Sequence, residues 1–179
     1  MVYMFLAQGF EEVEALCPLD LLRRAGVEIK TVGVGSDVIC GAHGIRVFAD
    51  MKDSEFSDKA PEAVILPGGM PGTLNLDASA TVHRAIDDAL KSGAHIAAIC
   101  AAPSILGKLG LLNGKEAICY PGFEEKLLGA KISKKRVVTD GNVTTAAGMG
   151  VALDFGLELV KILCSDEKAV ELRRGVIAD

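Results

Sequence analysis

Cys100 is the residue whose position in this sequence most clearly suggests chemistry. It follows the apolar run of residues 95–99, which predicts a buried strand, and precedes the small residues and proline of 101–103, which open a predicted helix. A residue at such a strand-to-helix turn projects above the sheet beside the first helix amides. These amides and the helix dipole favour a thiolate, so we expect a lowered pKa for Cys100. The alternative is that Cys100 is only a small apolar residue that ends a core strand.

A second candidate element is the segment LPGGMPG, residues 66–72, which follows another apolar run. Its successive glycines, Gly68 and Gly69, can turn backbone N–H groups toward a neighbouring site, and such donors are what an oxyanion needs. The alternative is an ordinary loop rich in glycine and proline. If this loop lies beside Cys100, it is a candidate oxyanion-binding loop.

Three acidic residues near the N-terminus, Glu11, Glu12 and Glu14, form the third candidate group. Pro18 lacks an N–H, so the carbonyl of residue 14 loses its helical partner and we expect a bend there. Glu14 could then reach the thiol, whereas Glu11 and Glu12 suit the first helical turn. Solvent exposure is the more common outcome for all three. Because a carboxylate beside a thiolate raises both pKa values, a pair of Glu14 and Cys100 works only if it shares one proton.

None of the three histidines is expected to act as a base for Cys100 within one chain. His95 precedes it by five residues on the same strand, which is about 16 Å at roughly 3.3 Å per residue. His83 lies in the middle of a predicted helix and is expected at the surface. His43 lies in a predicted hairpin turn and could reach the site only from another subunit.

These residues are positioned by apolar strands that alternate with helices, a pattern that predicts an open, doubly wound α/β sandwich with a mostly parallel sheet covered on both faces. Ligands in such folds bind beyond the carboxyl ends of the strands, where the loop after the first strand, the LPGGMPG segment and Cys100 should meet. The predicted strands are 2–7, 27–34, a hairpin within 37–50, a run from 62, 95–100, 116–120, 135–140 and 142–147, and the predicted helices are 11–26, 79–93, 103–110, 150–164 and 165–175.

The composition narrows the classes of function. A chain of 179 residues, 50% of them hydrophobic, predicts one domain over 1–179. The net charge of −5 is interspersed and only 4% of residues are aromatic, so no nucleic-acid partner is expected. Five cysteines without a CxxC pair argue against disulfides and zinc. No metal-ligand or nucleotide-binding motif is visible, so no metal or cofactor is expected. The sequence shows no signal peptide or membrane span, so we expect a cytoplasmic protein with no membrane partner.

Four segments form a specific combination: LAQGFEEVEALCPLDLLRRAG, VILPGGMPG, HIAAICAAPSILGKLGLL and TAAGMGVALDFGLELV. In this order and spacing they resemble the ThiJ/PfpI superfamily, in the clade of the parkinsonism-associated deglycase and its bacterial relatives, over nearly the whole chain. The resemblance implies a flavodoxin-like three-layer sandwich, a homodimer, and a reactive cysteine hydrogen-bonded to a protonated glutamate. It assigns Cys100 as nucleophile and Glu14 as its partner. It assigns Gly69 and Ala101 as amide donors to an oxyanion or an oxidised sulfur.

The sequence departs from the family pattern at several positions. Tyr120 stands where many members have a histidine, and Ala147 where some have an arginine. His43 falls near the place of a residue that a partner subunit brings toward the cysteine. We therefore treat Gly68, His43 and Tyr120 as candidate substrate-site or cross-subunit residues. Protease members have a histidine after the elbow cysteine, and Ala101 in that position disfavours peptidase activity.

The residues and the resemblance together predict a cofactor-independent, cysteine-dependent enzyme of the glyoxalase or deglycase type. Its expected partners are small α-oxoaldehydes such as methylglyoxal, or glycated proteins. The alternative is an oxidative-stress sensor or redox-regulated chaperone that works through oxidation of Cys100. A third interpretation is a binding domain with an inert buried cysteine, and a cysteine peptidase is the least expected.

Overall fold

The apolar runs of the sequence form a seven-stranded sheet in the computed structural model, which describes residues 1–178. All neighbouring strands are parallel except the two at one edge, residues 137–140 and 143–146, which pair with each other in antiparallel fashion. The predicted mostly parallel sheet is therefore confirmed. Across the sheet the strands are β10 (Val137–Asp140), β11 (Val143–Ala146), β7 (His95–Ile99), β6 (Ala63–Leu66), β1 (Val2–Leu6), β2 (Ile29–Gly33) and β5 (Met51–Lys52).

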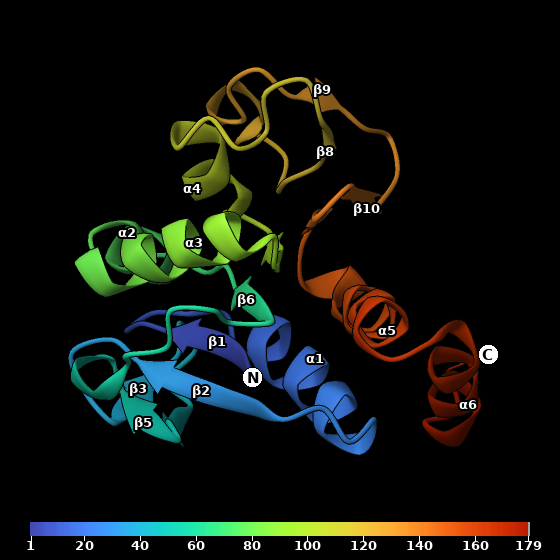
Figure 1. The fold of residues 1–179 in the computed structure, drawn as a ribbon, viewed down its shortest axis with the longest axis horizontal. Coiled ribbons are helices and arrows are strands. Elements are labelled where there is room, and N and C mark those ends of the chain that lie inside the picture. Colours follow the sequence, from blue (N-terminus) through green and yellow to red (C-terminus); the bar gives the residue numbers. More distant parts are fainter. Residues whose placement is uncertain (179) are drawn as a thin grey trace.

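Helices cover both faces of this sheet and complete a three-layer sandwich (Figure 1). The central strands β1, β6 and β7 are buried along their whole length, which is why they read as continuous apolar runs. Alternate residues of these strands face two separate apolar cores, one under each helical layer. One layer contains α2 (Gly72–Asp77), α3 (Ala80–Ser92) and α4 (Pro103–Lys108), and the other contains α1 (Glu12–Arg24), α5 (Ala152–Leu163) and α6 (Asp166–Gly175).

Capping residues set the ends of several helices where the sequence predicts them. The Ser79 side chain accepts a hydrogen bond from the N–H of Val82 at the start of α3, and Gly93 ends that helix with φ of +73°. Ser165 caps α6 in the same way. Helix α1 continues through Pro18, so the proline does not break it.

Two small sheets stand beside the main one. Strands β3 (Val38–Cys40) and β4 (Arg46–Phe48) form the predicted hairpin. The strand predicted at 116–120 is wrong in extent, because only β8 (Glu116–Ala117) is extended and it pairs with β9 (Lys131–Ile132) outside the main sheet. The sequence did not indicate β5, β9, α2, or the 3₁₀ turns Asp53–Glu55, Glu124–Lys126 and Met149–Val151, which are too short to show a period.

Close packing between α1 and α5 fixes the helix that carries Glu14. At Gly156 of α5, an added Cβ would lie only 2.8 Å from the Cα of Pro18 and 2.7 Å from a methyl carbon of Leu21. The absence of a side chain at Gly156 therefore lets the two helices approach closely. This contact holds α1 against the sheet and sets the position of its first turn.

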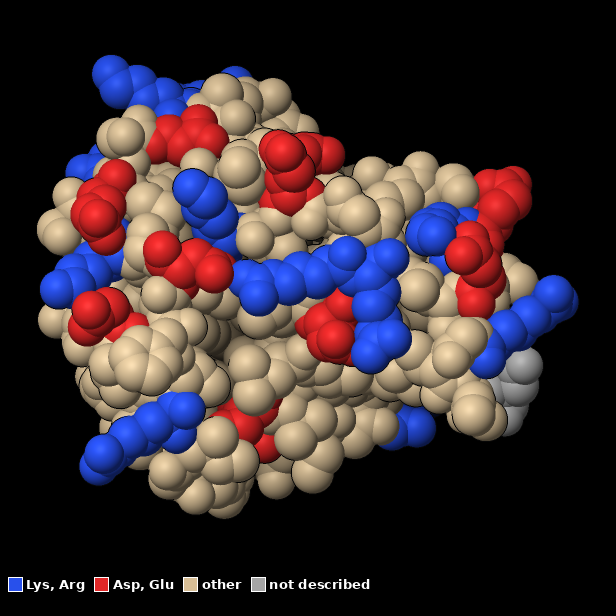
Figure 2. All heavy atoms as spheres, turned by 90° about the horizontal axis from the view of Figure 1, so that it is seen from below, with Lys and Arg blue, Asp and Glu red and all other residues tan. Residues whose placement is uncertain are grey.

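The surface carries both signs of charge without a large region of either. Acidic and basic side chains are interspersed on the face shown in Figure 2, which matches the pattern in the sequence. All five cysteines are free thiols, as predicted. Among the described residues, no helix combines the length and the apolar character that a membrane crossing requires.

Candidate active site

Cys100 lies in the sharp turn between β7 and α4, at the carboxyl edge of the sheet. Its φ is +64°, a left-handed conformation that a residue with a side chain rarely adopts. Two backbone hydrogen bonds hold this turn: the Cys100 N–H donates to the carbonyl of Ala146 at 2.9 Å, and the Tyr120 N–H donates to the Cys100 carbonyl at 2.8 Å. The thiol is half-buried, so it is held in place yet open to a ligand.

Glu14 reaches the thiol from the first turn of α1. Its side chain is almost fully buried, with 1% of its surface exposed, and its charge acts on the neighbouring Cys100 thiol. The Gly68 N–H donates to Glu14 Oε2 at 3.0 Å. The helix begins at this point because the Glu11 carboxylate caps it, accepting a hydrogen bond of 2.7 Å from the Glu14 N–H. Solvent exposure, the more common outcome for such an acid, is therefore wrong for Glu14.

The Gly-Gly loop leaves room for this pair of side chains. A Cβ on Gly68 would lie 2.6 Å from the Cβ of Cys100 and 2.6 Å from Glu14 Oε2. Gly69 has a φ of +89°, a left-handed conformation that favours glycine. The backbone amides of Gly69 and Ala101 act to lower the pKa of the thiol. The structure thus brings together the five residues that the sequence assigned to the elbow, the acid and the amide donors.

Burial raises the pKa of Glu14 to about 7. The hydrogen bond with Cys100 and the backbone amides of Gly68 and Met149 act in the opposite direction, but they only partly offset the loss of water around the carboxylate. A glutamic acid in this position therefore keeps its proton at pH values where an exposed one would be ionised.

The pKa of Cys100 is raised to about 12, first by burial and then by the charge of Glu14. The lowered pKa that the helix position predicts is therefore wrong for a thiol that faces an ionised carboxylate, because the two amides do not outweigh these effects. Above about pH 7 and below about pH 12 the pair holds one proton. A thiolate forms in this range only when that proton resides on Glu14.

A neighbouring polar cluster joins α1 to the β3–β4 hairpin. Glu12, which is 3% exposed, accepts a hydrogen bond of 2.7 Å from the His43 N–H and contacts His43 Nδ1 at 2.8 Å. Burial raises the pKa of Glu12, but the hydrogen bonds from His43 outweigh it and lower that pKa overall. The expected exposure of Glu12 is therefore wrong. Glu11 lies in the same cluster, a grouping of acids and histidine that sequence spacing did not show.

The other two histidines stay away from the thiol, as the sequence predicts. His95 is buried, and its Nε2 lies 2.8 Å from Thr144 Oγ1 on the neighbouring strand. His83 is half-buried, and its Nε2 lies 2.7 Å from the carbonyl oxygen of Asp77. Neither contacts Cys100 among the hydrogen bonds of residues 1–178.

A cavity of about 320 Å³ is lined by segments that follow β8 and β11, including Tyr120, whose N–H bonds the Cys100 carbonyl, and Gly148, which lies close to Glu14. Tyr120 and Ala147 line it, at the two positions where the sequence departs from the family pattern. Arg136 and the Met149 segment also line it, and sequence reasoning missed both. The predicted β10–β11 hairpin could have indicated Arg136. The strand β10 is antiparallel to β11, so it begins at the edge of the sheet where the parallel strands end, and Arg136 directly precedes it.

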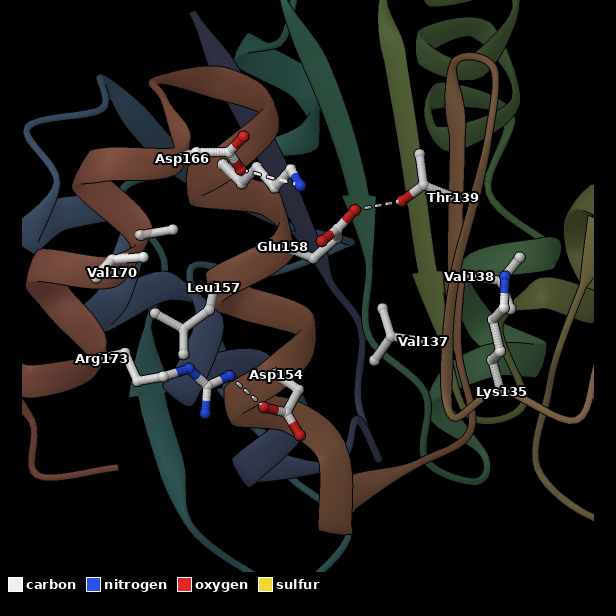
Figure 3. A pocket seen from close by; sticks show the side chains of 12 residues that line it. Lys135, Val137, Val138, Thr139, Asp154, Leu157, Glu158, Asp166, Val170 and Arg173 are labelled. Atoms are coloured by element: carbon white, nitrogen blue, oxygen red, sulfur yellow. Dashed lines mark hydrogen bonds and ion pairs between the residues drawn. The ribbon is translucent and has the colours of Figure 1, made fainter. Parts of the chain in front are cut away.

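A larger cavity, of about 470 Å³, lies elsewhere between α5, α6 and β10 (Figure 3). None of the candidate residues lines it. Two ion pairs lie within its lining, Arg173 with Asp154 at 2.6 Å and Lys161 with Asp166 at 2.9 Å. These pairs connect the last two helices, and the cavity contains no nucleophilic thiol.

Three known proteins are similar to this chain in sequence or in structure. Protein dj-1beta of Drosophila melanogaster is 32% identical over 97% of this chain and 95% of its own. A protein of Caenorhabditis elegans named glutathione-independent glyoxalase DJR-1.2 is 30% identical over 90% of this chain and 87% of its own. The structure described as Toxoplasma gondii DJ-1, oxidized, is 30% identical and superimposes with a TM-score of 0.94 over 98% of this chain and 97% of its own.

The model of the DJ-1/PfpI family matches residues 1–162, which include the elbow cysteine, the Gly-Gly loop and the buried glutamate. These matches extend over nearly the whole chain, and the structural likeness covers every layer of the sandwich. The chain belongs to the DJ-1/PfpI family.

Proposed function

We propose that this protein is a cofactor-independent glyoxalase or deglycase-type enzyme that acts on α-oxoaldehydes such as methylglyoxal, or on their adducts with proteins. The observation that carries the proposal is a half-buried thiol in a left-handed strand-to-helix turn, packed beside the buried carboxyl group of Glu14 and the Gly68–Gly69 loop. A relative that is 30% identical is named a glutathione-independent glyoxalase, which supports the same chemistry here.

The proposed reaction uses the pair as nucleophile and acid. The Cys100 thiolate adds to the aldehyde carbon, and the carbonyl electron pair moves to oxygen, where the amides of Gly69 and Ala101 stabilise it. Glu14 gives its proton to this oxygen, and the resulting carboxylate removes the aldehyde hydrogen as a proton and delivers it to the neighbouring carbonyl carbon, while the proton on the first oxygen moves to the second. The first carbon is thereby oxidised and the second reduced. The product is a thioester of lactate, which water cleaves to lactate and free Cys100.

Replacement of the nucleophile tests this proposal directly. We expect Cys100→Ala to reduce kcat/KM for methylglyoxal at least about 10³-fold, because no covalent adduct can form. Cys17→Ala, which removes another half-buried thiol of the same chain, should keep the activity. The measurement is steady-state consumption of methylglyoxal with chemical identification of lactate. Consumption that persists in Cys100→Ala contradicts the proposed mechanism.

The shared proton predicts a particular pH dependence for Cys100 alkylation by iodoacetamide. In the native protein the rate should rise with pH through about 7, where the pair loses its first proton. In Glu14→Gln the carboxyl group is gone, and its charge no longer raises the pKa of the thiol. The alkylation rate should therefore rise in a single step, at a pH below 12.

Glu12→Gln is a matched control for this titration, because Glu12 is buried on the same helical turn but bonds the hairpin. Its profile should follow that of the native protein. Superimposable profiles for Glu14→Gln and the native protein would show that Glu14 does not share the proton.

A second candidate function is an oxidative-stress sensor or a redox-regulated chaperone. Two observations favour it: the amides that face the thiol could also bind the oxygens of an oxidised sulfur, and one structural relative is described as oxidized. If this function holds, limiting peroxide should add two oxygens selectively to Cys100 and leave Cys17 and Cys40 unchanged. Peptide mass spectrometry checks this outcome, and oxidation spread evenly over the half-buried thiols would exclude a dedicated sensor.

We also propose that the protein forms a homodimer at the face beside this site. Three partly exposed apolar side chains support it: Val13 is 43% exposed, Ile45 53% and Met149 53%. Val13 stands between Glu12 and Glu14 in the chain, the Ile45 N–H donates to Glu12 Oε1 at 3.4 Å, and the Met149 amide acts on Glu14. The mass in solution should be twice 18.7 kDa by light scattering, and Val13→Glu should shift it toward the monomer. A native monomer at all concentrations would contradict the proposal.

A further inference from the structure

The wall of the cavity of about 320 Å³ includes residues close to the Cys100–Glu14 pair. The Met149 amide, which belongs to this wall, acts to lower the pKa of the Glu14 carboxyl. At Gly148 a Cβ would lie 3.8 Å from Glu14 Oε1 and 3.3 Å from the Tyr120 ring. This glycine, which lines the cavity, therefore lies close to both the buried carboxyl and the exposed tyrosine.

Hydrogen bonds across the sheet place Arg136 at the same edge as the cysteine. The Cys100 N–H donates to the carbonyl of Ala146, and the next residue, Ala147, donates its N–H to the carbonyl of Arg136 at 2.9 Å. Arg136 thus lies two strands from Cys100, which is about 10 Å between their Cα atoms at the usual strand spacing. A long arginine side chain can cover much of that distance.

Among the described residues that line this cavity, Arg136 is the only charged one. Its Nη2 donates to the carbonyl of Gly150 at 3.0 Å, and within residues 1–178 it forms no ion pair with a carboxylate. A guanidinium group has five N–H donors, so several remain for a ligand. The neighbouring Lys135 differs, because it lies 3.8 Å from Glu116 and lines the other large cavity.

We propose that Arg136 can bind a carboxylate of the substrate, so that the site also takes small aldehydes that carry a carboxylate group. The planar guanidinium suits a planar carboxylate better than a point charge does. The inference rests on the proposed function in one respect, namely that the Cys100 sulfur forms a bond to the aldehyde carbon of the substrate. In that step the thiolate adds to the aldehyde carbon, and the oxygen takes the proton of Glu14, which gives a reversible hemithioacetal without any change of oxidation state overall.

Two alkylating reagents of different charge test Arg136 without requiring turnover. Iodoacetate is an anion, whereas iodoacetamide has nearly the same shape and is neutral. We compare their second-order rate constants at Cys100 by peptide mass spectrometry at one fixed pH. In Arg136→Gln the ratio of the iodoacetate rate to the iodoacetamide rate should fall about fivefold, the size expected for one solvent-accessible charge interaction.

The matched variants separate charge recognition from a structural role. Arg136→Lys should keep most of the ratio, and Lys135→Gln, which removes the same charge one residue away, should leave it unchanged. If Arg136 only supports the Gly150 loop, both rates change together and the ratio stays at the native value. An unchanged ratio in Arg136→Gln, or an equal fall in Lys135→Gln, overturns the proposal.

Glyoxylate, a small aldehyde with a carboxylate, supplies the second readout. It should protect Cys100 from iodoacetamide in the native protein, and this protection should weaken about fivefold in Arg136→Gln. Its neutral methyl ester should protect both proteins equally. If methylglyoxal is not consumed but these differences appear, the proposed enzyme activity fails and the carboxylate site stands. If methylglyoxal is consumed and these differences are absent, the proposed enzyme activity stands and the carboxylate site fails.

Discussion

The left-handed backbone of Cys100 determines how the rest of the site is arranged. A side chain in this conformation costs about 1–3 kcal/mol, and the surrounding structure must hold it there. Two backbone hydrogen bonds do so: the Cys100 N–H bonds the carbonyl of Ala146, and the Cys100 carbonyl accepts from the Tyr120 N–H. They also position two neighbouring segments, one leading to Gly148 and the other carrying the tyrosine. The same turn that exposes the thiol therefore builds the cavity next to it.

The buried carboxyl of Glu14 sets a second requirement, which is that the loop carrying Gly68 must approach it closely. Its oxygen lies within hydrogen-bond distance of the Gly68 N–H, and any side chain at Gly68 would overlap it or the cysteine. The packing of α1 against Gly156 of α5 holds this carboxyl in place from the other side. Because the carboxyl is removed from water, it keeps a proton near neutral pH and can pass it to the sulfur or to an oxygen bonded to the same ligand.

The sequence was sufficient to predict the sheet, the hairpin, the main helices and the residues that meet at the thiol, because each depends on local periodicity or on a strand end. It was not sufficient for the pKa of Cys100, which depends on burial and on a charge 86 positions away in the sequence, at Glu14. It also placed Glu12 among exposed acids, because the hairpin that buries it is distant along the chain. Pairings of this kind follow from tertiary structure, which residue spacing does not encode.

Arg136 shows why a site can extend beyond the residues that a family pattern marks. The strand that it precedes runs against its neighbours, so a residue far from the cysteine in sequence returns to the catalytic edge. Ala147, which follows the strand next to that of Cys100, donates its N–H to the carbonyl of Arg136. Arg136 thereby reaches this edge of the sheet from a strand two away from that of the cysteine. A cation in this place would attract anionic substrates and would also favour the thiolate form, so substrate choice and nucleophile activation would depend on the same group.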